Sequence, residues 1–136
     1  MRVRTLYRLT LAGAAVAAMI AEWNFVAAEQ QAPAGVVHAY FQAAVDKRCD
    51  KAFGLLTDPV RSIFGTQERL CRLTAGERLV RFQIGECTRN GDTARVLVTL
   101  VRPALTTVDA VTLSSVDGQW RIAAFDVLRS PPVPVQ

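Results

Sequence analysis

Residues 111–127, late in the chain, restrict the fold more than any other stretch. Apolar residues occupy alternate positions there, and a Val-Asp-Gly turn interrupts them at residues 116–118. Trp120 and Ile122 then alternate with polar residues on the returning strand. Alternation on both sides of a short Asp-Gly turn is typical of a β-hairpin. The end of the chain is therefore predicted to form antiparallel strands, with Trp120 and Ile122 in the core.

A second hairpin is predicted just before the first. Apolar and polar residues alternate over residues 79–88, and Asn90 and Gly91 form the strongest short turn signal in the chain. Pro103 ends the apolar run that follows, because proline cannot donate to a ladder of backbone hydrogen bonds. Four strands in an antiparallel meander are expected, over residues 79–88, 93–102, 107–115 and 119–128.

Helical periodicity dominates the part before the sheet. Between residues 35 and 48, apolar side chains recur every three to five positions and form one stripe. Start and stop signals predict three further helices, over residues 50–56, 59–64 (capped by Asp58 and ended by Gly65) and 66–75 (ended by Gly76). Helices followed by hairpin-connected strands indicate an α+β fold, with the helices packed on a four-stranded antiparallel sheet.

The chain begins with the pattern of a cleavable leader. Three arginines precede an apolar run at residues 9–21, which is shorter than the roughly 20 residues of a membrane-spanning helix. Small residues before Glu29 suit a signal peptidase. The expected organisation is a signal peptide at 1–28, a linker at 29–34, one domain at 35–129 and a Pro-rich disordered tail at 130–136. We expect a periplasmic or secreted protein without a stable membrane anchor after cleavage.

The charge pattern does not favour nucleic acid as a partner. After the predicted leader, the chain carries 13 basic and 11 acidic residues, so it is nearly neutral. These charges are scattered singly, and no aromatic residues are interleaved with a basic run. We therefore interpret them as a solvated surface.

The three cysteines, Cys49, Cys71 and Cys87, all follow the predicted leader. An oxidising compartment favours one disulfide and one remaining thiol. A bond between Cys49 and Cys71 would link two helices and stabilise the fold by about 3 kcal/mol in the chain-entropy model. Pairing of Cys71 with Cys87 and three unpaired thiols are the alternatives. The chain has no Cys-x-x-Cys motif and a single histidine, so neither a metal nor another cofactor is expected.

Several motifs together resemble a known superfamily. These are Ala39-Tyr40-Phe41 on an amphipathic helix, the Phe-Gly-Leu-Leu turn at 53–56, the hairpin at 90–96 and the Asp-Gly-Gln-Trp-Arg-Ile run at 117–122. Over residues 35–128 the chain is similar to the nuclear transport factor two-like superfamily, also described as SnoaL-like or cystatin-like, and especially to its small exported bacterial members of unknown function. The resemblance implies a curved sheet wrapped round the first helix as a cone with an apolar mouth. Some members, such as ketosteroid isomerases, place an Asp or His inside this cone.

Three residues are weak candidates for catalysis. His38 is the only histidine and lies at the edge of the apolar stripe, where a histidine satisfied by water is the simpler interpretation. Tyr40 could donate a hydrogen bond to a ligand, although an aromatic ring on that stripe is more often core. Asp126 shares its parity with Trp120 and Ile122, so a regular strand would point it inward.

A β-bulge at Ala123 and Ala124 would instead turn Phe125 inward and Asp126 outward. We predict this bulge, because burying a large ring is less costly than burying an unpaired charge.

The function expected from these features is that of an exported, non-catalytic binding domain. It would bind an apolar small molecule or a protein partner through its cone or sheet face, with Tyr40, Phe41, Phe82 and Trp120 as ligand-contacting residues. The alternatives are a small isomerase or cyclase that uses the acid-base candidates above, and a structural homodimer paired through its sheet face.

Overall fold

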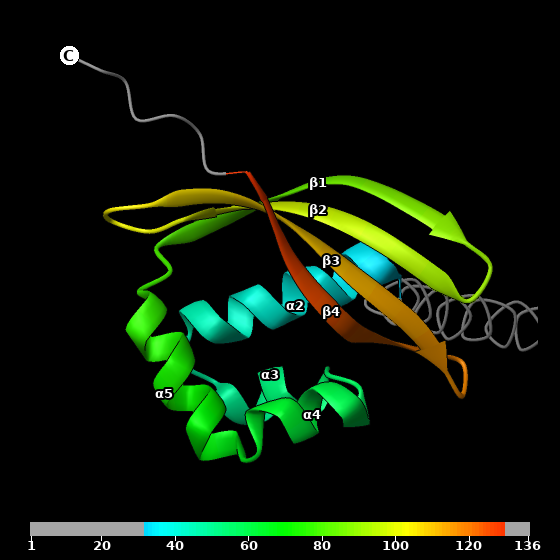
Figure 1. Cartoon of the computed structure of the whole chain (residues 1–136), viewed down its shortest axis with the longest axis horizontal. Coiled ribbons are helices and arrows are strands. Elements are labelled where there is room, and N and C mark those ends of the chain that lie inside the picture. Colours follow the sequence, from blue (N-terminus) through cyan, green and yellow to red (C-terminus); the bar gives the residue numbers. More distant parts are fainter. Residues whose placement is uncertain (1–31, 130–136) are drawn as a thin grey trace, which may run out of the picture. The chain divides into compact units, whose positions relative to one another are not determined.

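The computed structural model describes residues 32–129 of the chain. Within these residues, four helices precede one sheet, whose four antiparallel strands follow the order β1-β2-β3-β4 (Figure 1). This confirms the predicted α+β fold and meander. The predicted signal peptide and tail lie outside the described residues. The elements are α2 (Pro33–Val45), α3 (Cys49–Gly54), α4 (Asp58–Phe64), α5 (Gln67–Glu77), β1 (Arg81–Asn90), β2 (Thr93–Val101), β3 (Thr106–Val116) and β4 (Gln119–Arg129).

Helix α2 is the central helix, and it differs from the prediction at both ends. It begins at Pro33, two residues before the expected start at residue 35, so the predicted linker overlaps its first turn. Proline suits this position because its missing N–H has no partner in the first turn of any helix. The helix ends at Val45 rather than residue 48, and Lys47 adopts a positive φ of 59° before α3 begins. Among residues 32–129, no helix is long and apolar enough to cross a membrane.

The start and stop signals of the later helices were partly correct. Thr66 caps α5, and its side chain accepts a hydrogen bond from the Arg69 backbone N–H at 3.2 Å. Gly65 follows α4 with a φ of 87°, as expected of a glycine that ends a helix. Thr57, not Asp58, is the N-cap residue of α4.

Gly76 does not end α5. The helix continues through Gly76 to Glu77, and Arg78 ends it in the left-handed conformation. A glycine inside a helix destabilises it by only about 1 kcal/mol relative to alanine, which is too little to end a helix by itself.

The core lies between α2 and the face of the sheet that curves over it (Figure 1). Alternate residues of the two central strands, such as Val96 and Val111, are fully buried against this helix. On β4, Trp120 and Ile122 are buried as predicted. Asp117 and Gly118 both adopt positive φ at the β3–β4 turn, which is the geometry that a two-residue hairpin requires.

Register shifts interrupt the pairing of the outer strands, one between β1 and β2 and two between β3 and β4, of which one lies between Val108 and Asp109. On β1 the register with β2 shifts between Ile84 and Cys87. On β4 Thr112 pairs with Ala124 whereas Leu113 pairs with Ile122, so Ala123 is the extra residue. This bulge at Ala123 is the one predicted at the two alanines, and it reverses the parity of the strand beyond it.

The two outer strands of the sheet are covered differently. The Ile122 N–H donates to the Leu55 carbonyl, and the Thr57 N–H donates to the Ile122 carbonyl, each at 2.9 Å. Leu56 thereby forms a parallel bridge with Ile122. We call the α3–α4 connection, residues 55–57, the cover segment of β4. In the described part of the chain, no comparable backbone bridge is recorded on the outer side of β1.

A disulfide joins Cys49 at the start of α3 to Cys71 in α5, with 5.3 Å between the Cα atoms. This is the pairing that the sequence favoured. The bond closes a loop with a sequence separation of 22 residues and links the two helices that flank α4. Cys87 on β1 is an exposed free thiol.

Candidate functional site

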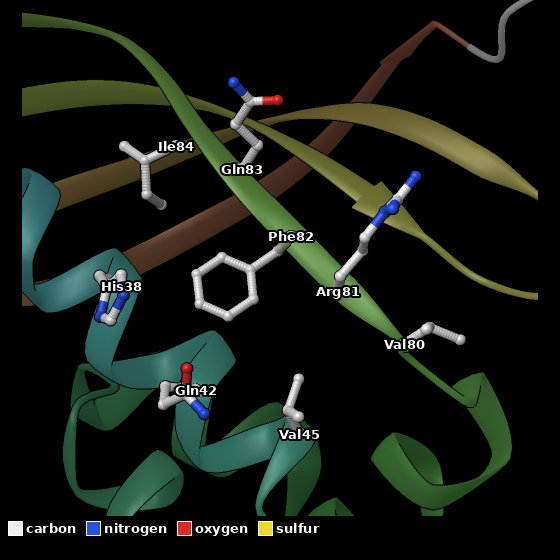
Figure 2. A pocket seen from close by; sticks show the side chains of 8 residues that line it. All are labelled: His38, Gln42, Val45, Val80, Arg81, Phe82, Gln83 and Ile84. Carbon is white, nitrogen blue, oxygen red and sulfur yellow. The ribbon is translucent and has the colours of Figure 1, made fainter.

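An open groove of about 460 Å³ lies between α2 and the edge strand β1. We call it the α2–β1 groove. In Figure 2 the ring of Phe82 points from β1 towards α2, where His38 and Gln42 face it. The residues that line it are His38, Gln42, Val45, Val80, Arg81, Phe82, Gln83 and Ile84.

Alternation along β1 determines which side chains enter this groove from the strand. Phe82 and Ile84 are half-buried and share one face, whereas Arg81 and Gln83 are exposed. The ring of Phe82 lies 5.2 Å from the His38 ring and 5.8 Å from the Phe41 ring, between centroids. Phe82 is therefore packed on one side and accessible on the other. The groove combines an apolar floor with polar groups of α2 at its rim.

The four aromatic residues predicted to contact a ligand do not lie together in this groove. Only Phe82 lines it. Tyr40 and Phe41 are each 5% exposed and belong to the core under the sheet. Trp120 is also buried, and the Arg89 guanidinium lies 5.0 Å from its ring centroid. Three of the four predicted rings are therefore placed as core residues.

Tyr40 lies in an environment that favours its neutral form. Burial raises the pKa of its hydroxyl well above the usual range, and the negative charge of Glu77 raises it further. Its ring packs against Phe125, at 5.2 Å between centroids, and against Phe41, at 5.0 Å. Tyr40 thus remains protonated at physiological pH and can act only as a neutral hydrogen-bonding group.

His38, Tyr40 and Asp126 are not gathered at one site. His38 is exposed and lines the α2–β1 groove, whereas Tyr40 belongs to the buried core. Asp126 is exposed beyond the bulge and does not line the groove. Phe125 takes the inward position, as predicted, and its ring contacts Tyr40 and Phe41.

Asp109 on β3 is a buried polar residue that was not among the predicted site residues. Its side chain shares a face with Val98, its partner on β2, and with Val111, so it points towards α2 rather than outward. Asp109 is only 6% exposed, and its Oδ1 atom has no hydrogen-bond partner among the described residues. A buried acceptor without a partner is unusual in a folded protein and is often related to function. The signal was its parity with Val111 and Leu113, two core residues of the same strand.

Binding of a metal ion by the described residues would require a group of suitable side chains close together. No group of three His, Cys, Asp or Glu side chains within residues 32–129 is arranged so that it could hold a metal ion. The polar side chains that could take part in binding or catalysis are therefore His38 and Gln42 at the groove rim, Tyr40 and Asp109.

Comparisons with known proteins identify the fold. No protein-family model and no curated protein matches the sequence. Among solved structures, a SEC-C motif containing protein from Rhodopseudomonas palustris has a TM-score of 0.59 at 11% identity, over 75% of this chain and 85% of the other. A DUF4783 family protein from Bacteroides ovatus has a TM-score of 0.54 at 13% identity, over 72% and 94%.

A third similar structure is a ketosteroid isomerase-like protein from Kribbella flavida. Its TM-score is 0.50 at 18% identity, and the match covers 74% of this chain and 81% of the other. At such identities the likeness establishes the fold alone. With a curved four-stranded antiparallel sheet over α2, the described part of the chain shares the α+β fold of these three structures, which is the fold that the resemblance to the nuclear transport factor two-like superfamily implied.

Proposed function

We propose that this chain is an exported, non-catalytic domain that binds an apolar small molecule in the α2–β1 groove. The observation that carries the proposal is the half-buried ring of Phe82, which forms the groove floor opposite His38 and Gln42 of α2. Ligand sites commonly combine an apolar surface with a few polar groups that fix orientation. The groove volume of about 460 Å³ also lies within the usual range for such sites.

Two features support export. The Cys49–Cys71 disulfide is of the kind that forms and persists in oxidising compartments. The first 28 residues also have the charge and apolar pattern of a cleavable leader.

The proposal is tested by binding of a fluorescent fatty-acid probe to the purified protein, with Phe82→Ala as the principal variant. Loss of a large apolar contact should weaken binding about 10- to 100-fold. Phe64→Ala is the matched control, because Phe64 is also a half-buried phenylalanine but does not line the groove. Native mass spectrometry of the exported protein would identify a co-purified ligand. Equal probe affinities in the two variants would contradict this assignment of the groove.

A second candidate function is acid-base catalysis on an apolar carbonyl compound. It is favoured by one observation, the unpartnered Oδ1 of Asp109 on the face of the sheet that also receives Tyr40. The test is isomerisation of an apolar unsaturated ketone by the wild-type protein and by Asp109→Asn. Loss of a general acid or base typically lowers a rate about 10²- to 10⁴-fold. Absence of turnover in the wild type would remove this candidate.

A further inference from the structure

A second cavity, of about 590 Å³, lies between the start of α4 and the β3–β4 hairpin. We call it the hairpin cleft. Figure 1 shows the two elements that form it, α4 and the turn that joins β3 to β4. The hairpin cleft shares no lining residue with the α2–β1 groove. It is therefore a separate site, and the proposed ligand of the groove does not account for it.

Two arginines from opposite sides of the hairpin cleft converge on one backbone oxygen. Arg61 Nη2, from α4, donates to the Gly54 carbonyl at 2.9 Å, and Arg121 Nη1, from β4, donates to the same oxygen at 2.8 Å. Both residues line the cleft. Two positive charges are thus held close together at a site where solvent only partly screens them.

Two aspartates, Asp58 and Asp117, line the hairpin cleft beside the two arginines, but among the described residues only Asp58 forms a recorded ion pair with either of them. In residues 32–129, the only recorded ion pair of either arginine joins Arg61 Nη1 to Asp58 Oδ1 at 3.5 Å. The Asp58 side chain is 94% exposed, so this pair is weak. A guanidinium group has five N–H donors, and the recorded hydrogen bonds of Arg61 and Arg121 leave donors free on both.

The rest of the lining limits which anion would fit. Asp117 also lines the hairpin cleft, so a doubly charged anion would meet repulsion there. Thr57, Ser114 and Gln119 add neutral polar groups that can donate to or accept from a ligand. A planar carboxylate matches the fork of N–H groups that a guanidinium presents.

We propose that the hairpin cleft binds a carboxylate, carried by a small organic acid or by the C-terminus of a peptide, between Arg61 and Arg121. The carboxylate accepts hydrogen bonds from both guanidinium groups and offsets their mutual repulsion. Their bonds to the Gly54 carbonyl orient both side chains before the ligand arrives. Asp58 competes with the ligand for Arg61.

The first experiment titrates the full chain with acetate, with chloride keeping the ionic strength constant. The readout is the two-dimensional nuclear magnetic resonance signals of the arginine Nε–Hε groups. Saturable shifts at Arg61 and Arg121, but not at the exposed Arg95 of β2, are expected. Shifts that grow linearly, or equally at Arg95, would overturn the proposal as an effect of adventitious ions only.

The second experiment compares three variants. Arg121→Gln should weaken acetate binding about 10-fold or more, because a charge-assisted hydrogen bond is lost. Arg95→Gln is the control with the same change of charge, and it should leave binding unchanged. Asp58→Asn should tighten binding, because an exposed competitor for Arg61 is removed. This last variant keeps the test decisive if Arg121→Gln does not fold, and weaker binding in it would contradict the proposal.

A third comparison identifies the source of the carboxylate. A dipeptide with a free C-terminus is titrated beside acetate, and the same dipeptide with an amidated C-terminus is the control. Tighter binding of the free dipeptide than of acetate indicates a peptide ligand, and equal binding indicates a small acid. If the amidated dipeptide binds as well as the free one, a carboxylate is not what the cleft recognises.

Discussion

The two outer strands of the sheet, β1 and β4, differ in how their free edges are protected. The edge of β4 is covered at Ile122 by the cover segment, which forms two backbone hydrogen bonds and one parallel bridge with that residue. The edge of β1 has no such bridge among the described residues and carries exposed charged residues, among them Glu86. Both devices discourage pairing with another chain.

This difference has a functional consequence. Edge charges leave the side of a strand accessible, whereas a covering segment buries it. The α2–β1 groove lies along β1, where only Phe82 and Ile84 are partly buried. The groove thus occurs at the less buried edge, where local opening needs less free energy.

The largest expected effect comes from a matched pair of isoleucines, one on each edge strand. Ile122 is fully buried, whereas Ile84 is half-buried at the groove. Ile122→Ala should lower the free energy of unfolding by about 4 kcal/mol, because it leaves a closed cavity, and Ile84→Ala by about 1 kcal/mol. Urea denaturation measures both. Equal losses of unfolding free energy in the two variants would show that β1 and β4 are equally well packed, which contradicts the difference between the two edges.

The Cys49–Cys71 disulfide should contribute nearly as much to the free energy of unfolding as the side chain of Ile122. It fixes α3, whose end leads into the cover segment, to α5. Replacing Cys49 and Cys71 together by serine should lower the free energy of unfolding by about 3 kcal/mol. Cys87→Ser on the exposed edge is the control and should change it by less than about 0.5 kcal/mol. Thermal unfolding of the three proteins measures the difference, and a large loss in the control would contradict it.

Alkaline pH should lower the stability of the fold through Tyr40, whose ring packs against Phe125 of β4. Burial, with the charge of Glu77, raises the pKa of the folded tyrosine above its unfolded value of about 10. Above that pH the unfolded state releases a proton that the folded state keeps, so stability is complete below pH 10 and falls above it. The slope contributed by Tyr40 reaches about 1.4 kcal/mol per pH unit.

Urea denaturation at pH 9 and pH 11 tests this, with Tyr40→Phe as the comparison. Other groups also titrate in this range, so the difference between the two proteins isolates the tyrosine. An equal loss of stability in both proteins would show that Tyr40 ionises as freely in the folded state as in the unfolded one.

The smallest effect on stability is expected for a substitution at the edge of β1. The same substitution should clearly change the self-association of the protein. Glu86→Val removes an exposed charge next to the bulge and should change the free energy of unfolding by less than about 0.5 kcal/mol. It should nevertheless promote pairing of β1 between two copies, visible as a concentration-dependent dimer in sedimentation. Thr99→Val on the central strand β2 is the control, since both neighbours of β2 are already paired. Association of the control alone would assign self-association to the sheet face instead of the edge.

The sequence predicted the fold where one physical effect dominates. The order of helices and strands follows from periodicity, and the orientations of Phe125 and Asp126 follow from the different cost of burying a ring and a charge. Helix ends were less accurate, because one glycine weakens a helix only slightly and α5 continues through Gly76.

The candidate site was predictable only in part, because residue type does not distinguish a groove from a core. Phe41 and Phe82 are both aromatic residues on apolar faces, yet only Phe82 lies at an opening that the edge position of β1 creates. Polar residues such as Thr107 and Thr112 occur on both faces of β3, so the alternation of residue types did not single out Asp109. The convergence of Arg61 and Arg121 depends on the cover segment, which no local pattern indicates.

The Cys49–Cys71 bond also makes the folded population depend on the redox state of the surroundings. A loss of about 3 kcal/mol corresponds to roughly a 100-fold larger unfolded fraction in a reducing solution. Before the bond forms, a larger fraction of the chains is therefore unfolded at equilibrium. For preparation of the protein, folding in an oxidising compartment should give the higher yield.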